Sequence, residues 1–114
     1  MRILFDQATP APLRPFLVGR EVSLAAEQGW DRLKNGDLLS AAEEAGFDLL
    51  LTTDKNMPYQ QNLAGRRIAV VTLSRQNWPQ LRPHVQLVFE AITMAKAGSF
   101  TGVEIPPLTE ESRI

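Results

Sequence analysis

Three aspartates stand where a parallel α/β sheet would bring their carboxylates together. Asp6 follows the apolar run at 3–5, and Asp54 follows an apolar run at 49–51 and two threonines. Asp37 begins a helical pattern that leads into the second run. Three carboxylates at one sheet edge repel one another unless they are protonated or bind a cation, and oxygen ligands suit Mg²⁺ or Mn²⁺. Such a site could activate water for attack on a phosphodiester.

Each aspartate also has a purely structural explanation. An aspartate at a strand end starts a turn through hydrogen bonds to its own backbone, and this explanation is as good as the metal site for Asp6 and Asp54. For Asp37 it is the better one, because an acid in the first turn of a helix is stabilised by the helix dipole. If the site is functional, Lys55 and the backbone near Thr53 would position the substrate.

The composition excludes several classes of protein. The 114 residues contain no cysteine and one histidine, so disulfides, zinc–thiolate sites and thiol catalysis are excluded. A net charge of −1 gives no global attraction for nucleic acid. No apolar run approaches the roughly 18 residues of a membrane span, and we expect no signal peptide, because a strand pattern follows Met1-Arg2 directly. We therefore expect a cytoplasmic protein with no membrane association.

Hydrophobic periodicity predicts alternating strands and helices. We expect strands at 2–5, 21–24, 48–53, 68–73 and 100–105, and helices at 10–18, 25–29, 37–45 and 78–95, the last kinked near Pro83. This order predicts a three-layer α/β/α sandwich with a mostly parallel sheet. We expect one domain at 1–105 and a C-terminal tail at 106–114. The carboxyl ends of parallel strands share one edge, where such sheets bind ligands.

Local signals predict how two of the helices begin. Thr9 is a candidate N-cap for the first helix, with Leu13, Phe16 and Leu17 on its buried face. Asn35-Gly36 is a turn signal that would end a polar connection just before Asp37.

Three motifs, in this order, resemble the family of small prokaryotic PIN-like proteins, which are described as predicted nucleases or toxin–antitoxin components. They are Ile3-Leu4-Phe5-Asp6 followed by a proline-containing helix, Asn35-Gly36-Asp37-Leu38-Leu39, and Leu51-Thr52-Thr53-Asp54-Lys55-Asn56. The resemblance covers about residues 1–75. It implies a PIN-like fold in which Asp6, Asp37 and Asp54 bind Mg²⁺ or Mn²⁺ and support RNA cleavage.

The chain departs from the family pattern at three positions. The family often has an acid or an amide where this chain has Gln7, and it often has acids where this chain has Asn35 and Asn56. Amide oxygens can still bind a cation, so these residues, with Thr53 and Lys55, remain candidate supporting groups. The missing charges lower the expected affinity for the cation.

Three hypotheses about function follow. The first is a metal-dependent ribonuclease, a hydrolase that serves as the toxin of a toxin–antitoxin pair. The alternative is a catalytically weak or inactive PIN-like module that binds protein or RNA. A nucleotide-binding or receiver-like domain is a third reading, although the chain has no glycine-rich phosphate loop.

Apolar residues in two segments suggest a protein partner. They are Phe16, Leu17 and Val18 near the first helix and Val88, Phe89, Ile92 and Met94 in the last one. A homodimer or an antitoxin-like protein would cover such a surface. Alternatively, the sheet of the same chain buries them.

Overall fold

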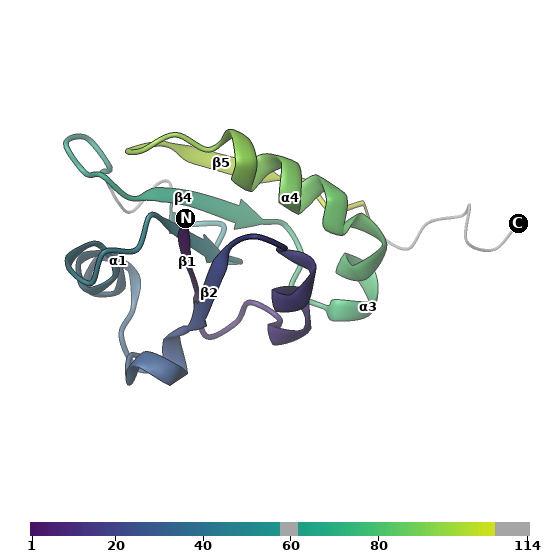
Figure 1. The fold of residues 1–114 in the computed structure, drawn as a ribbon, viewed down its shortest axis with the longest axis horizontal. Coiled ribbons are helices and arrows are strands. Elements are labelled where there is room, and N and C mark those ends of the chain that lie inside the picture. The colour runs from purple at the N-terminus through teal and green to yellow at the C-terminus, as the bar shows by residue number, and fades with distance from the viewer. Residues whose placement is uncertain (58–61, 107–114) are drawn as a thin grey trace, which may run out of the picture.

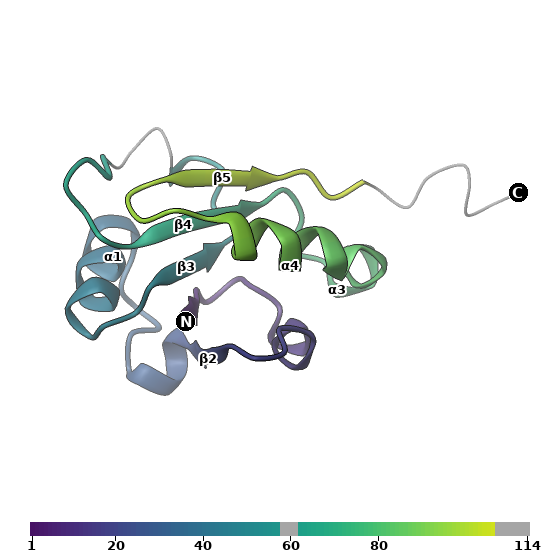
Figure 2. The ribbon, with the colours of Figure 1, turned by 45° about the horizontal axis from the view of Figure 1, so that its top comes forward.

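The computed structural model describes residues 1–57 and 62–106, apart from the side chain of Asn35. Within these residues, five parallel strands form one sheet in the order β2-β1-β3-β4-β5. Figure 2 shows the arrowheads of β3, β4 and β5 pointing the same way. The strands are β1 (Arg2–Phe5), β2 (Glu21–Leu24), β3 (Leu49–Thr52), β4 (Ala69–Leu73) and β5 (Phe100–Val103). The prediction of an α/β protein with a mostly parallel sheet is confirmed.

Apolar side chains cover both faces of the sheet. Successive strand residues point to opposite faces, and accordingly Ile3 and Phe5 belong to one hydrophobic cluster while Leu4 belongs to another. Helix α4 (Val85–Met94) contributes to the first cluster, and α1 (Asn35–Glu44) contributes to the second. Figure 1 shows these helices apart from one another, with strands between them. Burial on both faces explains why β1, β3 and β4 are apolar runs.

The strand order creates a crevice between β1 and β3. The chain passes from β1 to β2 on one side and then crosses back to β3 on the other. Open α/β sheets bind ligands at the carboxyl ends of the strands where the order reverses in this way. The fold therefore brings the residues that follow β1 and β3 to one crevice.

The first helix differs from the prediction in three respects. It is a 3₁₀ helix, η1 (Ala11–Phe16), with Pro15 inside it and Pro10 at the N-cap. Thr9 does not cap it, because the Thr9 hydroxyl bonds to Asp6 and Leu51 instead. Leu13 and Leu17 are buried as predicted, whereas Phe16 is 40% exposed. Phe16 packs against the ring of Trp78, which is itself only partly buried (5.6 Å between ring centroids), so Phe16 stays at the surface.

The other helices follow the predicted positions with shifted ends. Helix α1 begins at Asn35, so Asn35-Gly36 is its first turn and the predicted separate turn is wrong. Between β2 and α1 lies the predicted helical turn, η2 (Ala25–Gln28), which ends at Gly29 with a φ of 79°. The predicted last helix is divided into α3 (Trp78–Leu81), η3 (Arg82–His84) and α4, as expected for Pro83.

Several expectations concern the ends of the chain and its surface. Strand β5 lies at the sheet edge as predicted. Most of the predicted tail, residues 107–114, lies outside the described residues, as does part of the loop after Lys55.

The predicted partner surface is only partly exposed. Of its residues, Leu17, Val88 and Ile92 are core residues. Val18 and Met94 are exposed by 74% and 78%. No helix among the described residues is long and apolar enough to cross a membrane.

Candidate functional site

Asp6 is fixed at the end of β1 by two threonines. Its backbone N–H donates to the carbonyl of Leu51 on β3 (3.1 Å), which extends the β1–β3 ladder by one residue. Its Oδ1 accepts from the N–H (3.0 Å) and hydroxyl (2.5 Å) of Thr9, and its Oδ2 accepts from the hydroxyl of Thr52 (2.5 Å). A carboxylate has about four acceptor positions, so one remains for a further donor or a cation.

Asp54 is held in a tight turn two residues after β3. Its backbone N–H donates to the Thr52 hydroxyl oxygen (3.1 Å), and its Oδ1 accepts from the N–H of Asn56 (2.9 Å). The second bond is the local aspartate turn that was the structural alternative at this position. The Thr52 hydroxyl thus donates to Asp6 and accepts from the backbone of Asp54, and it links the two acidic segments.

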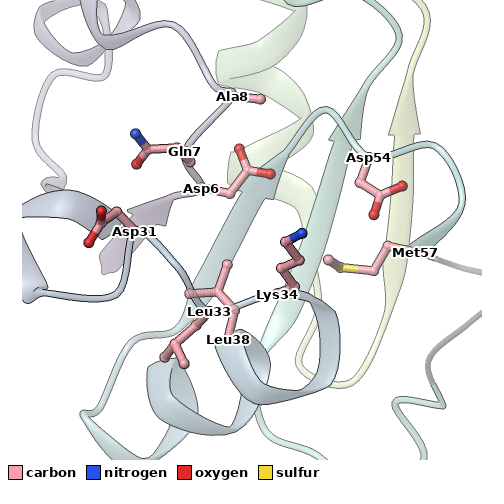
Figure 3. A pocket seen from close by; sticks show the side chains of 9 residues that line it. All are labelled: Asp6, Gln7, Ala8, Asp31, Leu33, Lys34, Leu38, Asp54 and Met57. Carbon is pink, nitrogen blue, oxygen red and sulfur yellow. The ribbon is translucent and has the colours of Figure 1, made fainter.

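Asp6 and Asp54 line one cleft of about 370 Å³ at the carboxyl ends of β1 and β3. Both side chains are half-buried. Figure 3 shows them on either side of the cleft, with the amino group of Lys34 directed into the space between them. The full lining is Asp6, Gln7, Ala8, Asp31, Leu33, Lys34, Leu38, Asp54 and Met57. Two of the three predicted acids are therefore brought together.

Asp37 lies apart from this pair. It is exposed in the first turn of α1 and is not among the residues that line the cleft. The third carboxylate in the lining is Asp31, in the connection before α1. The position of Asp37 agrees with its structural explanation, in which an acid stabilises the positive end of the helix dipole.

Of the predicted supporting residues, some line the cleft and others do not. Gln7 lines the cleft. Thr53 is half-buried and its hydroxyl donates to the amide oxygen of Gln76 (3.4 Å), while Lys55 and Asn56 are exposed and do not line the cleft. Asn56 contributes through its backbone N–H. Asn35 is the first residue of α1, and its side chain lies outside the description.

Four polar residues in or next to the site were missed by sequence reasoning. Lys34 and Asp31 lie in a polar connection without periodicity, so no pattern directs them to the cleft. Thr9 and Thr52 could have been recognised as hydroxyl partners for a nearby carboxylate, since each stands two or three residues from an aspartate. Thr52 is fully buried, so its hydroxyl must have a partner within the protein.

The donor set suits a divalent ion bound by few protein ligands. Among residues 1–57 and 62–106, no group of three or more acidic or histidine side chains is placed to hold a metal ion. A cage of Asp6, Asp37 and Asp54 therefore does not fit. Mg²⁺, however, commonly uses one or two carboxylates and fills the remaining positions with water and phosphate oxygens. Asp6 and Asp54 fit that smaller requirement.

No protein-family model, no curated protein and no solved structure matches this chain.

Proposed function

We propose that the protein is a PIN-like, metal-dependent ribonuclease that acts at the cleft between Asp6 and Asp54. The observation that supports this most directly is that both carboxylates line one cleft at the β1–β3 crevice. The proposal includes a three-layer α/β/α architecture of PIN type, which the two hydrophobic clusters favour. RNA is the proposed substrate, and phosphodiester hydrolysis is the proposed reaction.

In this proposal Asp6 and Asp54 hold Mg²⁺ or Mn²⁺, which when bound would supply charge neutralisation and an activated water. The protein fixes both carboxylates before the ion arrives. Asp6 is held by Thr9 and Thr52, and Asp54 is held by the N–H of Asn56. Such preorganisation avoids part of the cost of ordering ligands on binding. Thr52 keeps the two acidic segments at a fixed separation.

Lys34 contacts the substrate phosphate in this scheme. Its amino group points into the space between the acids, where a phosphodiester would sit (Figure 3). An ammonium group is a strong donor for phosphate oxygens. It also offsets the carboxylate charges that would otherwise repel a polyanion. Lys34 therefore takes the substrate-positioning role that the sequence suggested for Lys55.

The test is RNA cleavage by the purified chain and by three Asp→Asn variants. We expect cleavage that requires Mn²⁺ or Mg²⁺, that stops with EDTA, and that falls by at least about 100-fold in Asp6→Asn and Asp54→Asn. Asp37→Asn is the matched control, because it removes the same charge from an exposed position outside the cleft. Cleavage that persists in Asp54→Asn, or that needs no metal, would contradict the proposal.

A second candidate is a binding module without turnover. The position of Lys34 favours it, because an ammonium group between two carboxylates can neutralise them without a metal ion. The amides at Gln7, Asn35 and Asn56 favour it as well. This candidate predicts that the chain binds RNA or protein equally well with and without EDTA. Chelator-sensitive turnover on any RNA would exclude it.

A toxin–antitoxin role remains a proposal about partners. Among the described residues, Val18 and Met94 are the most exposed large apolar side chains, and Leu87 and Phe16 are exposed by 41% and 40%. Phe16 belongs to η1 and Val18 lies two residues after it, while Leu87 and Met94 belong to α4, and η1 and α4 contact each other. An antitoxin-like protein or a second copy of the chain is proposed to cover them. Size-exclusion chromatography with light scattering distinguishes a homodimer from a monomer that awaits another partner.

A further inference from the structure

A second cleft lies beside the acidic one at the same edge of the sheet. It has a volume of about 340 Å³, within the range of small-ligand pockets. Asp6, Gln7 and Ala8 line both clefts. They form a ridge that has the acidic cleft on one side and the second cleft on the other. The two clefts are therefore adjoining parts of one surface.

The second cleft follows from the pairing of β1 with β2. Phe5 lies opposite Leu24 in the register, so the residues after Phe5 and those from Leu24 onward border the same space. Beyond the ridge, the lining is largely apolar and includes Pro10, Leu24, Ala25 and Ala26. The acidic cleft, by contrast, contains Asp54, Asp31 and Lys34. One cleft thus offers charged groups and its neighbour offers an apolar wall.

Hydrogen bonds connect the residues on both sides of the second cleft. The ridge is a closed turn, because the Thr9 N–H donates to both the carbonyl (3.2 Å) and Oδ1 (3.0 Å) of Asp6. Next to Ala26 on the other side, Glu27 Oε1 accepts from the N–H of Leu24 (2.9 Å) and from Arg14 of η1 (2.7 Å). The Arg14–Glu27 bond links η1 to η2 at the surface.

We propose that the second cleft is a subsite for the base of the nucleotide next to the phosphodiester held in the acidic cleft. This inference rests on the proposed ribonuclease function. A base is apolar on its faces and polar at its edge, which matches an apolar wall beside the Gln7 amide. The strand crosses the ridge at Asp6, Gln7 and Ala8. Only an unpaired base can turn into such a cleft, so the substrate is single-stranded at this position.

The wild-type chain gives a first test that needs no mutation. Binding of uridine monophosphate is compared with binding of ribose 5-phosphate, which lacks the base, both by calorimetry. Uridine monophosphate should bind about tenfold more tightly, a difference that corresponds to about 1.4 kcal/mol. Equal affinity for the two ligands would overturn the subsite.

Filling the cleft gives a second test. Ala26 is exposed on η2 and lines the cleft, so Ala26→Trp would occupy the space of the base. Binding of a fluorescein-labelled oligouridylate should weaken by about tenfold, as measured by anisotropy in EDTA and again with Ca²⁺. Ala97→Trp places the same side chain at an exposed position outside both clefts and should bind as the wild type does. Circular dichroism verifies that Ala26→Trp is folded, and Ala26→Leu is the smaller replacement if it is not.

The outcomes separate the subsite from the proposed reaction. Weaker oligonucleotide binding in Ala26→Trp without any RNA cleavage by the wild type would support the subsite and contradict the ribonuclease. Metal-dependent cleavage together with unchanged binding in Ala26→Trp would support the ribonuclease and overturn the subsite.

Discussion

Asp6 and Thr52 are joined by a hydrogen bond of 2.5 Å between the ends of two neighbouring strands, although 46 positions separate them in the chain. Thr52 is completely buried and also accepts from the N–H of Asp54. One hydroxyl therefore connects both acids of the cleft. Removal of this hydroxyl should therefore weaken both the arrangement of the two acids and the stability of the fold.

Thr52→Val is expected to lower the free energy of unfolding by about 1–3 kcal/mol. The substitution keeps the shape of the side chain but leaves Oδ2 of Asp6 without a donor and the N–H of Asp54 without an acceptor. Urea denaturation measures the loss, and Mn²⁺ calorimetry measures the expected weakening of cation binding. Thr72→Val is the control, since Thr72 lies opposite Thr52 on β4 and bonds to neither acid. Similar losses of stability and of Mn²⁺ affinity in the two variants would argue against a role of Thr52 in linking Asp6 to Asp54.

Asp37→Asn is expected to leave RNA cleavage unchanged and to lower the free energy of unfolding by about 0.3–1 kcal/mol. The loss arises because a carboxylate in the first turn interacts favourably with the helix dipole. Thermal denaturation at low and high salt measures it, and salt should shrink the difference. Asp31→Asn is the comparison, because Asp31 lines the cleft and its loss should reduce activity. If Asp37→Asn abolishes cleavage while Asp31→Asn does not, the site lies elsewhere than proposed.

Lys34→Gln is expected to weaken oligonucleotide binding and to reduce its salt dependence. Each phosphate contact contributes a slope of about 0.7 in a plot of log affinity against log salt for a single strand. Anisotropy titrations over a range of salt concentrations measure the slope. The same variant should bind Mn²⁺ more tightly, because it removes a positive charge from between two carboxylates (Figure 3). Lys55→Gln, from an exposed position outside the cleft, should change neither quantity as much.

Glu43→Gln is expected to reduce stability at neutral pH by about 1–3 kcal/mol. The N–H of Arg67 donates to Glu43 (2.5 Å) and, with that of Ile68, lowers the pKa of Glu43 below its ordinary value despite partial burial. A lowered pKa in the folded state contributes stability that is complete above the unfolded value of about 4.3 and is lost as the pH falls through the folded value. The difference from the wild type should therefore shrink as the pH falls into the acid range.

Urea denaturation at neutral pH and at a pH of about 3 provides this measurement. Glu44→Gln is the control on the same helix, because Glu44 is exposed. A stability difference for Glu43→Gln that stays constant between the two pH values would show that the carboxylate charge is not responsible.

Gly98→Ala is expected to destabilise more than Gly19→Ala. Both glycines have a positive φ, 73° and 83°, which costs a side chain about 1–2 kcal/mol. At Gly98 a new Cβ would also lie 2.9 Å from the carbonyl oxygen of Arg66, whereas nothing lies within 4 Å at Gly19. Chemical denaturation of the two variants separates the backbone cost from the steric cost. Equal losses would mean that the chain near Arg66 moves freely to accommodate the methyl group.

The central strands and the meeting of two acids could be predicted from the sequence. Apolar runs at β1 and β3 end near Asp6 and Asp54, and parallel pairing then places both carboxylates at one edge. This inference needed only the direction of each strand. The positions of Asp37 and Lys34 depended on how the start of α1 is oriented relative to the sheet.

The docking of α1 on the sheet explains that failure. The helix begins at Asn35 rather than Asp37, but its start does not change the angle between Asp37 and the buried residues Leu38 and Leu39. The sequence leaves open how the first turn of the helix is oriented relative to the cleft. Lys34 reaches the cleft because α1 packs on the sheet through Leu38 and Leu39, which is a tertiary effect. The Thr9 hydroxyl was predicted to cap the first helix, but it bonds to Asp6 and to Leu51, and the second of these partners is 42 positions away in the chain.

The parallel order of the sheet also bears on how fast the protein folds. In the part of the chain that the structure describes, no strand pair is a hairpin, so each pairing joins residues that are distant in the chain. Small proteins dominated by such non-local contacts fold slowly, on the scale of milliseconds to seconds. The β1–β3 pair closes over a span of 46 positions, and it alone aligns Asp6 with the end of β3. A newly synthesised chain therefore acquires its acidic cleft only after its slowest class of contacts has formed.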